Sequence, residues 1–65
     1  MRSNLVDITL IKVAETKLAC GFKETEDDEE LVWLPKSQIE MEPTKKPGIF
    51  VVTMSEALAH DKELI

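Results

Sequence analysis

The first clear pattern in the chain is an alternation of apolar and polar side chains over residues 5–14. This segment is rich in β-branched residues and predicts a β-strand with Val6, Ile8 and Leu10 on one face and Asp7 and Thr9 on the other. After Leu10 the alternation changes phase, because Ile11 and Val13 fall on the opposite face. Such a change predicts a β-bulge, or burial of both faces, in the second half of the strand.

Four later segments also have the pattern of strands: residues 17–23, 30–34, 39–42 and 49–54. In the first of them, the alternation predicts that Leu18, Cys20 and Phe22 point inward. Pro35 is expected either to end the third strand or to sit where no ladder donor is needed. The last segment is apolar on both faces as far as Thr53, which predicts a strand in the interior of the sheet.

Two segments suit helical turns. Residues 36–38 are polar and suit one turn of 3₁₀ helix, and residues 55–63 suit a short terminal α-helix. Thr53 and Glu56 have the spacing of a capping box with Thr53 as the cap, and a start one or two residues later fits equally well. A helix of two turns must dock on the rest of the fold, since it would not persist alone in water.

Five short strands with short connections predict a mainly β fold. We expect a single domain over residues 1–65, a small five-stranded antiparallel barrel of SH3-like (or OB-like) type with a short C-terminal helix. The 3₁₀ turn favours the SH3-like form. A chain of this length buries only about 60% of the surface it exposes when unfolded, so a homodimer that buries a sheet edge is one expected arrangement.

The net charge of −5 comes from a single segment. Six of the seven residues from 24 to 30 are acidic, whereas the remainder of the chain holds seven acidic and eight basic residues. Like charges so close together repel and prefer full hydration, which predicts an exposed hairpin loop between the second and third strands. Two roles fit this loop: a phosphate-like row that occupies a basic groove of a partner, or a solvated segment that opposes aggregation.

The composition excludes several kinds of chemistry. One cysteine and one histidine, Cys20 and His60, cannot form an intramolecular disulfide or a Cys₄ or Cys₂His₂ zinc site. Two glycines exclude a glycine-rich phosphate loop, and the acidic segment lacks EF-hand spacing. We therefore expect no catalytic, cofactor-binding or metal-binding residues and no enzymatic activity. A free thiol, with no signal peptide and no apolar run of about 18 residues, favours the cytosol.

The stretch Leu31–Glu40 holds the only tryptophan and a compact polar triplet. Trp33 is either a core or half-buried anchor of the domain, or an exposed ring that stacks on a base or fills a partner's pocket. The triplet either forms a structural turn, with side chains that satisfy nearby backbone groups, or provides a binding edge. From this stretch and the acidic loop we predict these partner-binding residues: Glu26, Asp27, Asp28, Glu29, Glu30, Trp33, Lys36, Ser37 and Gln38.

Residues 30–39, ELVWLPKSQI, resemble the stretch V-W-[IL]-P-K-S-Q-[IV] of small β-rich proteins found among phage and prophage genes. Those proteins also have an earlier strand similar to residues 17–22 and a short helix after the final strand, so the resemblance covers the chain from Lys17 onward. This chain departs from their pattern at Ser55, where they tend to have proline, and near Ala57, where they tend to have tryptophan. Because such proteins are mostly uncharacterised, the resemblance implies a phage context and a small β-rich fold, and transfers no catalytic residue.

Three hypotheses of function follow from these patterns. The leading one is a non-enzymatic, phage-type binding module that contacts a host or replication protein and modulates or inhibits it through the acidic loop. The alternative is a single-stranded nucleic-acid-binding barrel of phage replication or recombination, with a basic surface. Its phosphate contacts would come from Lys17, Lys23, Lys36, Lys45 and Lys46. A structural role through self-association is the third.

Overall fold

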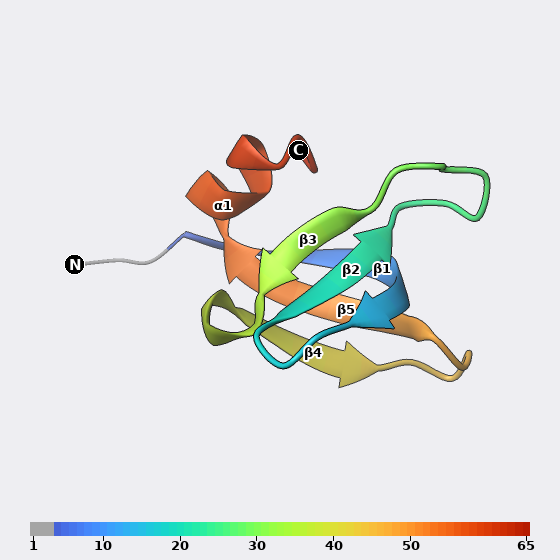
Figure 1. Ribbon diagram of the computed structural model, residues 1–65. Helices are drawn as coiled ribbons and strands as arrows, with labels where there is room; N and C mark the ends of the chain where they lie inside the picture. Colours follow the sequence, from blue (N-terminus) through green and yellow to red (C-terminus); the bar gives the residue numbers. More distant parts are fainter. Residues whose placement is uncertain (1–3) are drawn as a thin grey trace.

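The computed structural model describes residues 4–65, which form five strands and one helix (Figure 1). In chain order the elements are β1 (Leu5–Glu15), β2 (Ala19–Lys23), β3 (Val32–Pro35), the 3₁₀ turn η1 (Lys36–Gln38), β4 (Ile39–Pro43), β5 (Ile49–Ser55) and α1 (Glu56–Asp61). The strands form one antiparallel sheet in the order β3-β2-β1-β5-β4. The predicted mainly β fold with a short C-terminal helix is confirmed. Since β3 and β4 are sheet edges that each pair with one neighbour, the ladder does not close into a complete barrel.

β1 organises the sheet because its two halves pair with different neighbours. Residues 5–11 pair with β5, and residues 11–15 pair with β2. The register with β2 shifts between Lys12 and Ala14, so the predicted bulge lies in the second half of this strand. A bulge bends its strand and increases the local twist, which lets β1 serve both halves of the sheet. β5 pairs with β1 and β4 and therefore lies in the interior of the sheet, as its sequence predicted.

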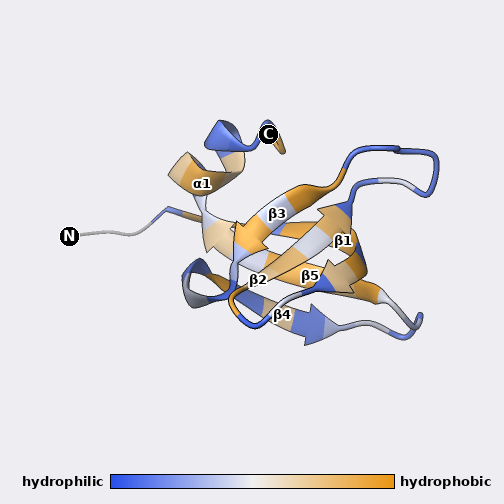
Figure 2. Ribbon diagram, in the orientation of Figure 1, coloured by the Kyte–Doolittle hydropathy of each residue, from blue (hydrophilic) through white to orange (hydrophobic). Residues whose placement is uncertain are grey.

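The core lies on the inner face of the sheet and is closed at one end by α1. Its fully buried side chains are Leu10, Cys20, Phe22, Leu34, Val52, Met54 and Ala59. Directly opposite residues of an antiparallel ladder share a face, which explains why Cys20 and Leu34 are buried together. Leu58 and Leu64 pack against this cluster from the C-terminal segment. Figure 2 shows apolar residues along the strands and a hydrophilic loop between β2 and β3.

Leu18 does not point inward, although Cys20 and Phe22 do. It is 76% exposed, because β2 begins at Ala19 and Leu18 belongs to the turn between β1 and β2. Thr16 closes this turn: its N–H donates to the Ala19 carbonyl (2.8 Å), and its Oγ1 accepts from the Ala19 N–H (3.1 Å). The strand predicted over residues 17–23 therefore begins two residues later, at Ala19.

Ser55, and not Thr53, caps α1. The Ser55 Oγ accepts a hydrogen bond from the Leu58 N–H at 3.1 Å, which is the usual contact of an N-cap residue. Thr53 still belongs to β5, where its hydroxyl donates to Asp7 across the ladder at 2.6 Å. The prediction of a Thr53 cap was wrong, and the later helix start is the correct one.

Both edge strands end in proline. The Lys36 N–H, directly after Pro35, donates to the Leu18 carbonyl at 2.9 Å, and the Thr44 N–H, directly after Pro43, donates to β5 at 3.1 Å. Hydrogen-bonded and non-hydrogen-bonded pairs alternate along an antiparallel ladder, so each proline nitrogen faces the open edge. The missing N–H therefore costs no ladder bond, in agreement with the expected placement of Pro35.

Candidate functional site

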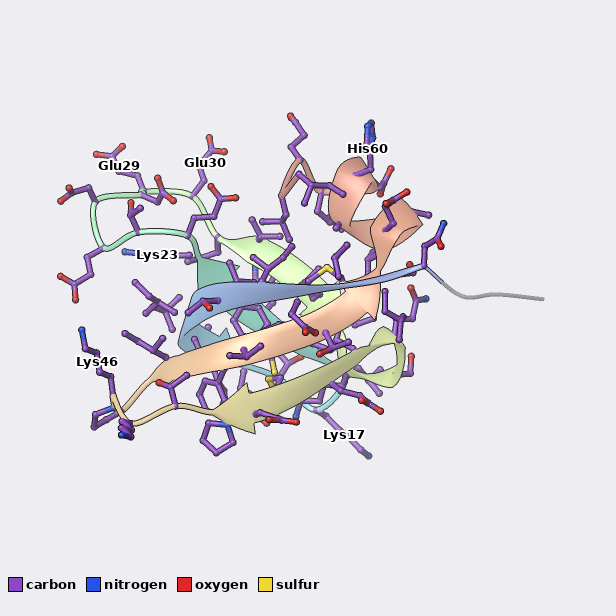
Figure 3. All side chains as sticks on the ribbon, turned by 180° about the vertical axis from the view of Figure 1, so that it is seen from behind. Lys17, Lys23, Glu29, Glu30, Lys46 and His60 are labelled. Carbon is purple, nitrogen blue, oxygen red and sulfur yellow. The ribbon has the colours of Figure 1, made fainter. Side chains whose placement is uncertain are left out.

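The segment predicted as an acidic hairpin loop is the connection between β2 and β3. This loop projects beyond the sheet (Figure 1), and the side chains of Glu29 and Glu30 point away from the sheet (Figure 3). Asp28 shapes the loop, because its carboxylate accepts from the Thr25 N–H at 3.2 Å and its own N–H donates to the Thr25 carbonyl at 3.3 Å. The other five acidic residues of the loop are exposed. The predicted exposed loop is confirmed.

The loop carboxylates are not neutralised by ion pairs within residues 4–65. The ion pairs of this part of the chain both involve Glu15 in β1, which contacts Lys12 and Lys36. Lys23 lies closest to the loop among the labelled lysines of Figure 3, yet it forms none of these pairs. The loop is therefore a concentrated negative charge, which attracts cationic groups and steers them toward this end of the molecule.

Trp33 lies on the outer face of β3, outside the core. Its side chain is 42% exposed, and its partner across the ladder is Gly21 of β2. A Cβ atom on Gly21 would lie 3.2 Å from Cη2 of Trp33 and 3.3 Å from Cδ1 of Leu31, so both side chains rest against the glycine backbone. Trp33 is thus a half-buried ring that is held in place on one side and open to solvent on the other. The inward positions of β3 are occupied by Val32 and Leu34.

The η1 triplet lies at the opposite end of β3 from the acidic loop (Figure 1). Lys36 forms an ion pair with Glu15, which ties the turn to β1. Ser37 and Gln38 are exposed and line a shallow pocket with residues of β4 and β5. Within residues 4–65, neither of their side chains forms a hydrogen bond, so they do not stabilise the turn in the way that one interpretation of the sequence required.

The structure therefore divides the predicted partner-binding residues into two groups. Glu26–Glu30 and Trp33 lie along the loop and β3; together with Leu31, which was not predicted but packs beside the Trp33 ring against Gly21, we call them the Trp33–loop surface. Lys36, Ser37 and Gln38 lie beyond the far end of a four-residue strand, which spans about 13 Å. Since Lys36 is also engaged by Glu15, the triplet is not part of the Trp33–loop surface.

Glu15 is the charged residue whose role the sequence did not reveal. Hydrogen bonds from Lys12 and Lys36 lower the pKa of its carboxyl group to about 2. The bond with Glu15 in turn raises the pKa of Lys12. The Lys12–Glu15 spacing was visible in the sequence, but Lys36 is 21 residues away and is brought close only by the fold. This cluster connects the bulged end of β1 to η1.

The lysines of the nucleic-acid hypothesis do not form one basic surface. Lys17 and Lys46 lie at opposite sides of the molecule in Figure 3, and Lys23 lies beside the acidic loop. Lys45 neighbours Lys46 in the connection between β4 and β5, and Lys36 is paired with Glu15. Proteins that bind nucleic acid cluster their basic residues on one face or along one groove, and this fold distributes them.

Other candidate chemistry is not assembled in the described part of the chain. No group of three His, Cys, Asp or Glu side chains within residues 4–65 could hold a metal ion. Cys20 is fully buried in the core, and His60 extends outward from α1 (Figure 3). Over these same residues, the structure has no helix with the length and apolar character needed to cross a membrane.

No protein-family model, curated protein or solved structure matches this chain at a significant level.

Proposed function

We propose that this chain is a non-enzymatic binding module that docks onto a basic surface of a protein partner through the Trp33–loop surface. The observation that carries the proposal is the combination of a half-exposed ring, fixed against Gly21, with an adjoining loop whose carboxylates have no ion pair within residues 4–65. Aromatic residues held in place are efficient interface anchors. Surface charge of one sign accelerates encounter with a complementary partner and excludes others.

The resemblance to phage and prophage proteins supports a bacterial partner in the host cytosol, such as a host or replication protein. A row of carboxylates in a basic groove competes with the phosphates of nucleic acid for the same contacts. Modulation or inhibition of the partner is the effect that this competition would have.

The experiment compares two charge variants of the full chain as bait in a bacterial lysate. The test variant removes three exposed charges from the acidic loop: Glu26→Gln, Glu29→Gln and Glu30→Gln. The matched control removes three exposed charges from β4 and α1: Glu40→Gln, Glu42→Gln and Asp61→Asn. Both variants change the net charge equally, so general electrostatic attraction is held constant between them.

We expect the unmodified chain and the control variant to capture the same partner, and the loop variant to lose it without a fall in Tm. Equal capture by the two variants would contradict the proposal. A shift of single-stranded oligonucleotides at low salt that disappears as salt is added would favour the nucleic-acid alternative. Light scattering of the unmodified chain at micromolar concentration tests the third hypothesis, self-association. That hypothesis predicts a dimer or larger species, and a monomer would reject it.

A further inference from the structure

The open edge of β3 presents backbone hydrogen-bonding groups beside Trp33. β3 pairs with β2 alone, and the Lys36 N–H donates to the Leu18 carbonyl at the end of this ladder. Because bonded pairs alternate in antiparallel ladders, Val32 and Leu34 direct their N–H and C=O groups toward β2. Trp33 therefore directs its N–H and C=O toward the open edge. Within residues 4–65, no backbone hydrogen bond outside the ladders involves Trp33.

Pro35 and the neighbouring side chains determine which groups of this edge can bind another strand. Pro35 has no N–H, and as the N-cap of η1 its carbonyl accepts the first hydrogen bond of the 3₁₀ turn, so Trp33 is the β3 residue that presents a free N–H and C=O at this edge. On the outer face, the Trp33 ring lies beside Leu31 and leaves an apolar surface next to the edge. An edge with free backbone groups and a neighbouring apolar side chain is what strand addition requires.

We infer that the β3 edge accepts an extended, basic segment of a protein partner as an additional antiparallel strand. This inference rests on the proposed function and specifies how the partner binds. Charge complementarity selects this occupant, because the loop leading into β3 carries six acidic residues. A shallow pocket beside Val32 is also lined by carboxylates of this loop, including Glu24, Asp28 and Glu29, although Lys62 reaches it as well.

The strand directions determine the order of residues in the partner segment. β3 runs from the acidic loop toward η1, so an antiparallel segment runs from η1 toward the loop. One residue of the segment exchanges both backbone hydrogen bonds with Trp33. Its basic residues then follow about two to four positions later, where a rise of about 3.4 Å per residue brings them to the loop. The partner is therefore an extended stretch with lysine or arginine on the C-terminal side of its contact with Trp33.

The test selects binders from a random library of twelve-residue peptides with the unmodified full chain, and then methylates the backbone nitrogens of the best binder one at a time. Peptide amides that face β3 alternate with amides that face away, so the second set is an internal control. We expect methylation at the β3-facing positions to weaken binding about tenfold or more, because a buried hydrogen bond is lost. Methylation at the intervening positions should change binding less than about threefold. Amide exchange should slow at Trp33 on binding, and remain slow throughout at Val32 and Leu34.

Each outcome separates the inference from the function on which it rests. Binding that depends on the loop charges but shows no alternation with methylation overturns strand addition and leaves the proposed function standing. Alternation that survives the loop variant Glu26→Gln, Glu29→Gln and Glu30→Gln supports the edge and overturns the charge-based choice of partner. A selection with no enriched peptide overturns both. Protection of the Trp33 amide that rises with the concentration of the protein alone would assign the edge to a second copy of this chain.

Discussion

Substitution of Gly21 tests the position of Trp33, since the ring lies where a side chain at residue 21 would need room. The added Cβ of Gly21→Ala would lie 3.2 Å from the ring and 3.3 Å from Leu31, whereas ordinary contacts begin at 3.4 Å. The ring can withdraw by a few tenths of an ångström because its other side is open. Replacement of glycine by alanine also stabilises a chain by about 0.4–1 kcal/mol through the unfolded state. We expect Gly21→Ala to change the free energy of unfolding by less than about 1 kcal/mol.

Gly21→Val adds two further methyl groups and forces the ring away from β2. Because Trp33 is 42% exposed, roughly 140 Å² of a side chain of about 250 Å² is covered. At about 25 cal/mol per Å², this burial stabilises the fold by at most about 3.5 kcal/mol. Part of it is retained when the ring moves, so we expect Gly21→Val to lower the free energy of unfolding by about 1–3 kcal/mol.

Both effects can be followed by the fluorescence of Trp33, which is the only tryptophan in the chain. Urea unfolding gives the stability, and acrylamide quenching of the native protein reports the exposure of the ring. Gly48→Ala is the control, because Gly48 has a φ of +82° with no atom within 4 Å of an added Cβ. It should cost about 1 kcal/mol through backbone strain and leave native quenching unchanged. Unchanged stability and quenching in Gly21→Val would refute the packing of Trp33 on Gly21.

Three further substitutions test the core, the helix cap and the ionic cluster. Phe22→Ala should lower the free energy of unfolding by about 3–5 kcal/mol. This is comparable to the whole stability expected of so small a core, so the variant should be unfolded. A folded circular dichroism spectrum at 25 °C would contradict this prediction. Ser55→Ala should lower the stability measured by thermal unfolding by about 1 kcal/mol, whereas Ser55→Asp should keep the N-cap hydrogen bond and the stability. Equal losses of stability in both variants would argue against capping by Ser55. The pKa of Glu15 is about 2 in the folded protein, against an ordinary value of 4.5. The ionised carboxylate therefore adds to the free energy of unfolding above pH about 4.5, and this addition is lost as pH falls toward 2. When the urea midpoint is measured against pH, Glu15→Gln should remove the fall between pH about 4.5 and 2. If the curves of the variant and the unmodified chain are identical, the ionic cluster does not contribute to stability.

Much of the sheet could be predicted because alternation reports local environment directly. The phase change after Leu10 predicted the bulge in β1, and Cys20 and Phe22 point into the core as their spacing required. What alternation could not provide was the exact end of a strand, which depends on the partner strand. Leu18 continues the pattern of β2, yet it lies in the turn closed by Thr16, where its side chain is exposed although its carbonyl still accepts a hydrogen bond from Lys36.

The candidate site was predicted less completely, because it depends on contacts between distant residues. The exposed acidic loop follows from its own charge, and the structure agrees. In contrast, Trp33 is placed by a glycine twelve residues earlier, and Lys36 is engaged by Glu15 from another strand. Thr53 fitted a capping box in the sequence, but its hydroxyl is already bonded to Asp7 across the ladder. Each of these outcomes was determined by a pairing that no local pattern contains.

The prolines that end both edge strands also affect how this protein would aggregate. Ordered stacking of copies needs an uninterrupted row of outward donors and acceptors along a strand edge. Pro35 and Pro43 interrupt that row on β3 and β4, so a folded molecule is a poor template for adding another. We therefore expect fibrils to form only from unfolded chains, so that at one total protein concentration the lag time shortens as the unfolded fraction rises.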